Sequence, residues 1–161
     1  MKTLKINETE YVLEFTFEAA EHKNLVQSMF NVVSGTYMLK HQDDSNVLNT
    51  MFNGISEMVG DIPSICRTAF YAGLLENNAV SEEEAKKLMK QYMKDNKLSY
   101  NKLFEELKEC MEDDGFFDLS GLTEVVQSIE KNVNDALKAE EKKTTKTPKK
   151  PQDRKKSTSA K

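Results

Sequence analysis

The stretch Ile62-Pro-Ser-Ile-Cys-Arg-Thr-Ala-Phe-Tyr-Ala-Gly-Leu-Leu75 decides the fold, because it is the most hydrophobic segment of the chain. Its apolar residues recur at helical spacing, which predicts a helix with one wide apolar face. Those residues are Ile62, Ile65, Cys66, Ala69, Phe70, Gly73 and Leu74. Asp61 with Pro63 is a typical helix start. We therefore expect a helix to begin there and to lie at the centre of the core.

Amphipathic helices are predicted on both sides of this segment. On its N-terminal side, one helix runs from Glu18 to Gly35, and another begins at a Ser45 cap and ends at Gly60-Asp61. The polar connection between them, Thr36 to Asp44, contains a local anchor at residues 37–39.

Three more helices are predicted after residue 78. The first begins at Ser81-Glu-Glu-Glu84, where the Ser and the last Glu form a capping box. The second begins at a Ser99 cap, and the last runs over residues 120–139. The body, residues 18–139, is thus a compact bundle of five to six helices.

Residues 3–17 have the period of two that is typical of β-strands, and they predict a hairpin. Leu4 and Ile6 alternate in the first strand, and the turn is expected at residues 7–10. The apolar face of the second strand consists of Tyr11, Leu13, Phe15 and Phe17. An isolated hairpin is marginally stable in water. Its apolar face must therefore pack on the helical body, which we favour, or on the hairpin of another copy.

The charge of the chain changes sign near its C-terminal end. Residues 1–141 contain 14 Lys and Arg against 26 Asp and Glu, whereas residues 142–161 contain nine against one. The latter segment has no aliphatic residue larger than Ala and no aromatic residue, so it has nothing to bury against its ordering entropy. We expect a single acidic α+β domain, mainly helical, over residues 1–141, and a disordered basic tail over residues 142–161.

No pattern of catalytic, metal-binding or cofactor-binding residues is present in the sequence. The two acidic helix connectors that follow Asp95 and Asp113 place Lys97 and Phe117 where a calcium loop needs oxygen ligands. His22 and His41 have no zinc-ligand spacing, and the six glycines form no phosphate loop. We therefore expect no enzyme activity, no cofactor and no small-molecule substrate.

The two cysteines and the N-terminus give further expectations. Cys66 and Cys110 lie on apolar helix faces, which favours two buried thiols and fits a reducing cytoplasm. The N-terminal residues lack the apolar run of a signal peptide, and no apolar run of the chain is long enough to cross a membrane.

The order of these features resembles the tail assembly chaperones of long-tailed, siphovirus-type phages and prophages of Gram-positive bacteria. The resemblance covers roughly residues 1–120. It rests on the hairpin residues Leu4-Lys-Ile6 and Tyr11–Phe17, on Ala69-Phe-Tyr-Ala-Gly-Leu-Leu75, and on the charged helix start at Ser81. It implies a non-enzymatic protein that coats the tape measure protein and keeps it soluble while the tail tube is assembled.

The resemblance also implies partners and a location. The tape measure protein is the expected partner, with the tail tube protein and further copies of this chain as additional ones. The chain would act in the host cytoplasm and be absent from the mature virion. Some members of the family have a longer, frameshifted form, and this chain would be the shorter one.

Two other classes of function remain open at this point. One is a small helical regulatory or nucleic-acid-associated protein, and the other is a phage connector subunit. The acidic body argues against nucleic acid, because it would repel a polyanion beyond the reach of the tail.

The candidate partner-binding residues lie in the hairpin and in the tail. They are Phe15, Phe17, Lys142, Lys143, Lys146, Lys149, Lys150, Arg154, Lys155 and Lys156. Met51, Met58, Met89 and Met93 are further candidates because methionine surfaces adapt to different partners, although we expect most of them in the core.

Overall fold

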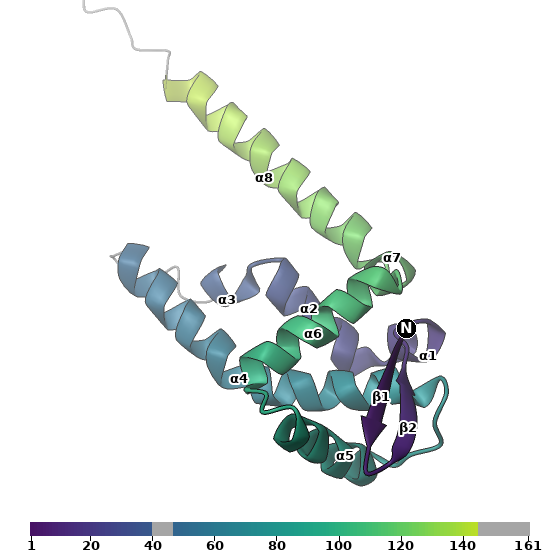
Figure 1. Cartoon of the computed structure of the whole chain (residues 1–161). Coiled ribbons are helices and arrows are strands. Elements are labelled where there is room, and N and C mark those ends of the chain that lie inside the picture. Colours follow the sequence, from purple (N-terminus) through teal and green to yellow (C-terminus); the bar gives the residue numbers. More distant parts are fainter. Residues whose placement is uncertain (40–46, 145–161) are drawn as a thin grey trace, which may run out of the picture. The chain divides into compact units, whose positions relative to one another are not determined.

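The computed structural model describes residues 1–39 and 47–144 and shows a mainly helical fold with an N-terminal β-hairpin, as predicted (Figure 1). In chain order the elements are β1 (Lys2–Ile6), β2 (Thr9–Leu13), α1 (Phe17–Glu21), α2 (Lys23–Val33), α3 (Thr36–Leu39), α4 (Val47–Leu75), α5 (Glu82–Asp95), α6 (Tyr100–Asp113), α7 (Phe116–Leu119) and α8 (Leu122–Thr144).

Two compact units make up the chain. The first is Met1–Gln127, and the second is Ser128–Lys161, of which the structure describes the later part of α8. We expected one domain up to residue 141, whereas the first unit ends at Gln127, inside α8. The fold of the first unit is described below.

Helix α4 is the central element of the first unit, and it packs against α1, α2, α3, α5, α6 and β2. The buried side chains of its C-terminal half include Ile62, Cys66, Phe70 and Leu74, so the prediction that residues 62–75 lie at the centre of the core is confirmed.

The prediction of two separate helices over residues 45–75 was wrong. The helix is continuous through Gly60 and Asp61 and has Pro63 in its interior. Proline removes the hydrogen bond to Val59, and Figure 1 shows that α4 changes direction between its blue and teal parts. The bend lets the helix continue. Ser45, the expected cap, lies outside the described residues.

The hairpin is shorter than predicted, and its turn is tighter. Ile6 pairs with Thr9, so the turn is Asn7-Glu8 alone, and both residues have positive φ, 48° and 64°. Two left-handed residues give the turn the twist that fits antiparallel strands. The second strand ends at Leu13 rather than at Phe17. Phe17 is instead the first residue of helix α1, which spans residues 17–21.

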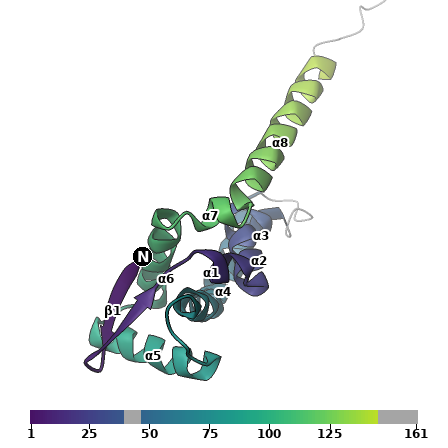
Figure 2. The same ribbon diagram turned by 90° about the vertical axis from the view of Figure 1, so that its right-hand side faces the viewer.

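The hairpin packs on the helices of its own chain, as we favoured. Leu4, Ile6, Leu13 and Phe15 are buried, and Figure 2 shows the strands lying beside α5, which β1 contacts. The ring of Phe15 meets the edge of Phe116, with ring centres 6.4 Å apart. Burial of these four side chains contributes several kcal/mol.

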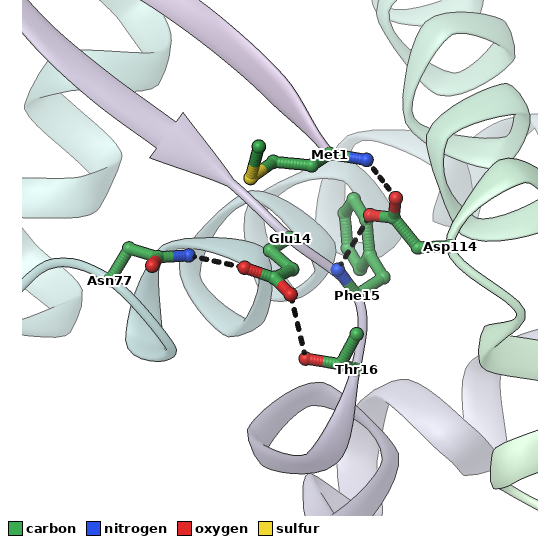
Figure 3. A network of polar contacts seen from close by, with 6 residues as sticks. All are labelled: Met1, Glu14, Phe15, Thr16, Asn77 and Asp114. Carbon is green, nitrogen blue, oxygen red and sulfur yellow. Dashed lines mark hydrogen bonds and ion pairs between the residues drawn. The ribbon is translucent and has the colours of Figure 1, made fainter.

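Polar contacts fix the open end of the hairpin, where β1 begins and β2 ends (Figure 3). The N-terminal amine of Met1 pairs with Oδ1 of Asp114, and the backbone N–H of Phe15 donates to Oδ2 of the same carboxylate at 2.9 Å. Asn77 donates to Glu14 at 2.7 Å, and the backbone N–H of Glu14 donates to the carbonyl of Gly73 at 2.8 Å. These contacts attach the N-terminus and the segment that follows β2 to the C-terminal ends of α4 and α6.

The remaining helix boundaries follow local signals. The capping box at Ser81 and Glu84 and the cap at Ser99 are confirmed. The predicted helix 18–35 is divided at His22, whose ring accepts from the backbone of Leu25 and starts α2. The predicted helix 120–139 is α8, which reaches Thr144.

Candidate partner-binding surface

The apolar seam of α4 is buried in one half of the helix and exposed in the other. Leu48, Phe52, Ile55, Val59, Ile62 and Cys66 follow one another at alternating steps of four and three residues. Such steps keep side chains on one side of a helix. Ile62 and Cys66 are buried, whereas Phe52 is 69% exposed and Val59 is 48% exposed.

We call the exposed part of this seam the α4 face, which consists of Leu48, Met51, Phe52, Ile55 and Val59. These five are half of the large apolar side chains that are exposed in the part of the chain that the structure describes. Contiguous exposed apolar patches on a protein surface mark interaction sites. The α4 face is therefore the candidate site of this protein.

No charge lies on the α4 face. The acidic residues of its segment are Glu57 and Asp61, and the helical repeat puts them about 160° and 120° away from Ile55 around the axis. Asp61 accepts a hydrogen bond from the hydroxyl of Tyr37 at 3.0 Å. The acids therefore point to the side of α4 on which α3 packs.

Close backbone packing fixes α3 against that other side of α4. A Cβ atom on Gly54 would lie 2.7 Å from the carbonyl oxygen of Tyr37, so only glycine allows this approach. Tyr37 is buried, which confirms it as a local anchor. Burial, followed by its hydrogen bond to Asp61, raises the pKa of Tyr37 to about 12. The α4 face thus belongs to a helix that is held in place from behind.

The two phenylalanines that we expected at a partner surface have different environments. Phe15 is fully buried between α4 and α7, so it stabilises the fold and cannot contact a partner in this folded state. Phe17 is 67% exposed at the start of α1. Two residues apart, these side chains no longer share a face, because the strand ends before them.

The expected basic and methionine candidates are also spread over the chain. Lys142 and Lys143 belong to the last turn of α8 rather than to a tail that begins at residue 142, because the helix continues to Thr144. The other expected tail residues lie outside the described residues: Lys146, Lys149, Lys150, Arg154, Lys155 and Lys156. Of the methionines, Met51 is exposed on the α4 face, Met58 and Met93 are half-buried, and Met89 is buried.

Apart from the α4 face, the first unit has an apolar hollow of about 420 Å³ between α2 and the start of α8. Its lining includes Val26, Phe30, Leu122 and Val125, with Lys23 at its edge. It is open to solvent and shallow, and it lacks the regular spacing of the α4 face.

The two cysteines have the environment of unreactive thiols. Both are buried, and the thiol of Cys66 donates to the carbonyl oxygen of Tyr100 at 3.4 Å. Burial raises the pKa of Cys66 to about 12 and, as the main cause, also raises the pKa of Cys110. Both thiols are therefore protonated near neutral pH, which disfavours nucleophilic chemistry.

Across residues 1–39 and 47–144, no three His, Cys, Asp or Glu side chains are placed to hold a metal ion together. Within the same residues, no helix has the length and apolar character that a membrane crossing requires.

The sequence predicted a helix over this segment and named Met51 as a partner candidate, but helical spacing does not tell an exposed face from a covered one. The length of the helix in the structure explains the exposure. A helix of 29 residues extends over about 44 Å, longer than the diameter of a small domain, so one end of its apolar seam projects beyond the core.

Comparison of the chain with protein-family models, with curated proteins and with solved structures gave no match.

Proposed function

We propose that this protein is a non-enzymatic tail assembly chaperone of a long-tailed phage, which binds the tape measure protein and keeps it soluble during assembly of the tail tube. The observation that supports this proposal best is the charge-free, exposed α4 face. It offers a partner helix a row of apolar anchors on a rigid support.

The chemistry of the α4 face fits a long helical client. An amphipathic helix binds a complementary apolar surface through anchors at i, i+3, i+4 and i+7. Leu48, Met51, Phe52, Ile55 and Val59 provide that spacing. Met51 adds a flexible side chain that adapts to different client sequences. Many weak contacts of this kind along one client add up through avidity.

The charge of the chain fits the same role. Residues 1–127 contain 22 acidic and 12 basic residues, so the first unit is acidic. A client coated by such units gains net charge, which favours solubility. The chain would act in the host cytoplasm and leave the client when the tube forms. The tail tube protein is a second expected partner, and the basic residues 142–161 are a candidate contact for it.

The test is co-expression with the tape measure protein of the same genome, followed by measurement of soluble client and by pull-down. We expect the client to be soluble only with this chain. The variant Phe52→Ser/Ile55→Ser should lose most of the soluble client. Leu119→Ser, which removes an exposed apolar side chain from α7, should not. A client that stays insoluble with the wild-type chain, and does not co-purify, would contradict the proposal.

Two measurements separate the alternatives. A connector subunit remains in the particle, so mass spectrometry of purified virions would detect it, whereas a chaperone is absent. A nucleic-acid-associated protein would bind DNA with a steep dependence on salt. Truncation after Glu141 would abolish such binding, because it removes nine of the chain's 23 basic residues.

A further inference from the structure

We infer that two copies of this chain pair in antiparallel orientation through the α4 face, so that each copy covers the other until a client binds. This inference rests on the proposed function only in naming what the pairing regulates. The pairing itself follows from the spacing, charge and exposed area of the face.

The spacing of the α4 face is complementary to itself. An antiparallel pair with its two-fold axis level with Asn53 and Gly54 sets Phe52 opposite Ile55 of the second copy. The same axis sets Leu48 opposite Val59 of the second copy. Leu48, Phe52, Ile55 and Val59 thus meet one another, whereas Met51, beside the seam, comes level with Ser56 of the second copy. This alternation of fours and threes is the pattern of paired helices.

The absence of charge from the α4 face allows a second copy of this acidic chain to be the occupant. An acidic chain can meet its own copy only where no like charges come together, and the α4 face carries no charge.

The rest of the first unit favours the same orientation. Apart from Gly54, the buried residues of α4 run from Ile62 to Leu74. Most of each core therefore surrounds the later half of its helix. Antiparallel pairing keeps the cores of the two acidic first units at opposite ends of the paired residues 48–59, whereas parallel pairing would set the two cores side by side.

The exposed area suits a reversible pair. From their exposed fractions, the five side chains present on the order of 500 Å² per copy. A symmetric pair would bury about 1,000 Å² in total, the lower limit for a specific interface. We expect a dissociation constant on the order of 10 µM, weak enough for a client helix to displace the second copy.

The first test measures the mass of the full chain in solution, without client, by sedimentation at about 1 µM and about 100 µM, on either side of that constant. We expect an average mass close to 18.4 kDa at the lower concentration and one that approaches twice that mass at the higher one. Each substitution in a symmetric interface removes two contacts. Phe52→Ser/Ile55→Ser should therefore raise the dissociation constant by about a hundredfold, while Leu119→Ser, which removes an exposed apolar side chain from α7, leaves it unchanged.

Three results of this first test would overturn the inference. They are a monomer at the highest concentration, a dimer that survives Phe52→Ser/Ile55→Ser, and equal weakening by Leu119→Ser. Circular dichroism checks that the variants are folded. Because the client is absent, the result is independent of the chaperone test: a dimer that fails to solubilise the client contradicts only the proposed function.

The second test determines the orientation by disulfide cross-linking. Antiparallel pairing separates the two copies of residue 48 by about 16 Å along the helix axis, beyond the reach of a disulfide. Leu48→Cys alone should then give no cross-linked dimer, whereas Leu48→Cys/Val59→Cys should give one on oxidation. A cross-linked dimer from Leu48→Cys alone would show parallel pairing, and its absence from the double variant would contradict the pairing. Cys66 and Cys110 are buried and serve as the internal background.

Discussion

Replacement of Gly73 by alanine would test how tightly the hairpin is fixed to α4. A Cβ atom at this position would lie 2.7 Å and 2.9 Å from two ring atoms of Phe15, and 3.1 Å from a methyl carbon of Leu13. The Phe15 ring cannot move aside, because it is fully buried and meets the edge of Phe116. The backbone N–H of Phe15 is held by Asp114, and that of Glu14 by the carbonyl of Gly73 itself.

Two opposing terms determine the size of the effect. Forcing an extra carbon into a packed core costs about 1–3 kcal/mol. Alanine in place of glycine inside a helix gains about 0.5–1 kcal/mol. With a contact as short as 2.7 Å the first term dominates. We therefore expect Gly73→Ala to lower the free energy of unfolding by about 1–2 kcal/mol.

Urea unfolding monitored by circular dichroism measures this free energy, and the same helix supplies a matched control. A Cβ atom on Gly60 would meet nothing within 4 Å, so Gly60→Ala should raise the free energy of unfolding by about 0.5–1 kcal/mol. The two substitutions thus differ in sign. In a Phe15→Leu background, which removes the ring, Gly73→Ala should lose most of its cost. Equal stability of Gly73→Ala and Gly60→Ala would refute the reasoning.

Three further predictions concern single side chains. Asp114→Ala removes the acceptor of the Met1 amine and of the Phe15 N–H, and should cost about 2 kcal/mol in urea unfolding; the exposed neighbour Asp113→Ala should cost much less. Ser81→Ala removes the capping box of α5 and should lower the free energy of unfolding by about 1 kcal/mol, and a change below the error of the measurement would contradict the role of the cap. Because its pKa is raised above the usual value, Tyr37 contributes stability that is complete below pH 10 and is lost as the pH rises toward 12. Tyr37→Phe should remove the step near pH 12 from an ultraviolet tyrosine titration, because it removes the hydroxyl that ionises there. A step that persists in the variant would belong to another tyrosine and would contradict this assignment.

Local sequence signals predicted the elements whose causes are themselves local. The capping box at Ser81, the cap at Ser99 and the helical period over residues 62–75 depend on neighbours within four or five residues, and the structure has all of them. The alternation in residues 3–13 predicted the hairpin for the same reason. Boundaries were less certain, because Phe17 fits a strand period but lies in a helix.

Long-range packing decided what these signals left open. Pro63 and Gly60 have the local pattern of a helix boundary, but contacts of α4 with six other elements keep it continuous and bent. Phe15 and Phe52 are both aromatic residues in apolar patterns, yet one is fully buried and the other is 69% exposed.

The sequence by itself therefore determined the class of the fold, the hairpin, most of the helical segments and the charge, because these depend on composition and on neighbours along the chain. Only the tertiary structure decided that the hairpin packs in cis and that the seam of α4 is buried at one end and exposed at the other. The physical reason is that an apolar helix face has the same periodicity whether it is covered or not. Burial of the face depends on which distant elements reach it, and here they cover the seam of α4 from Ile62 onward.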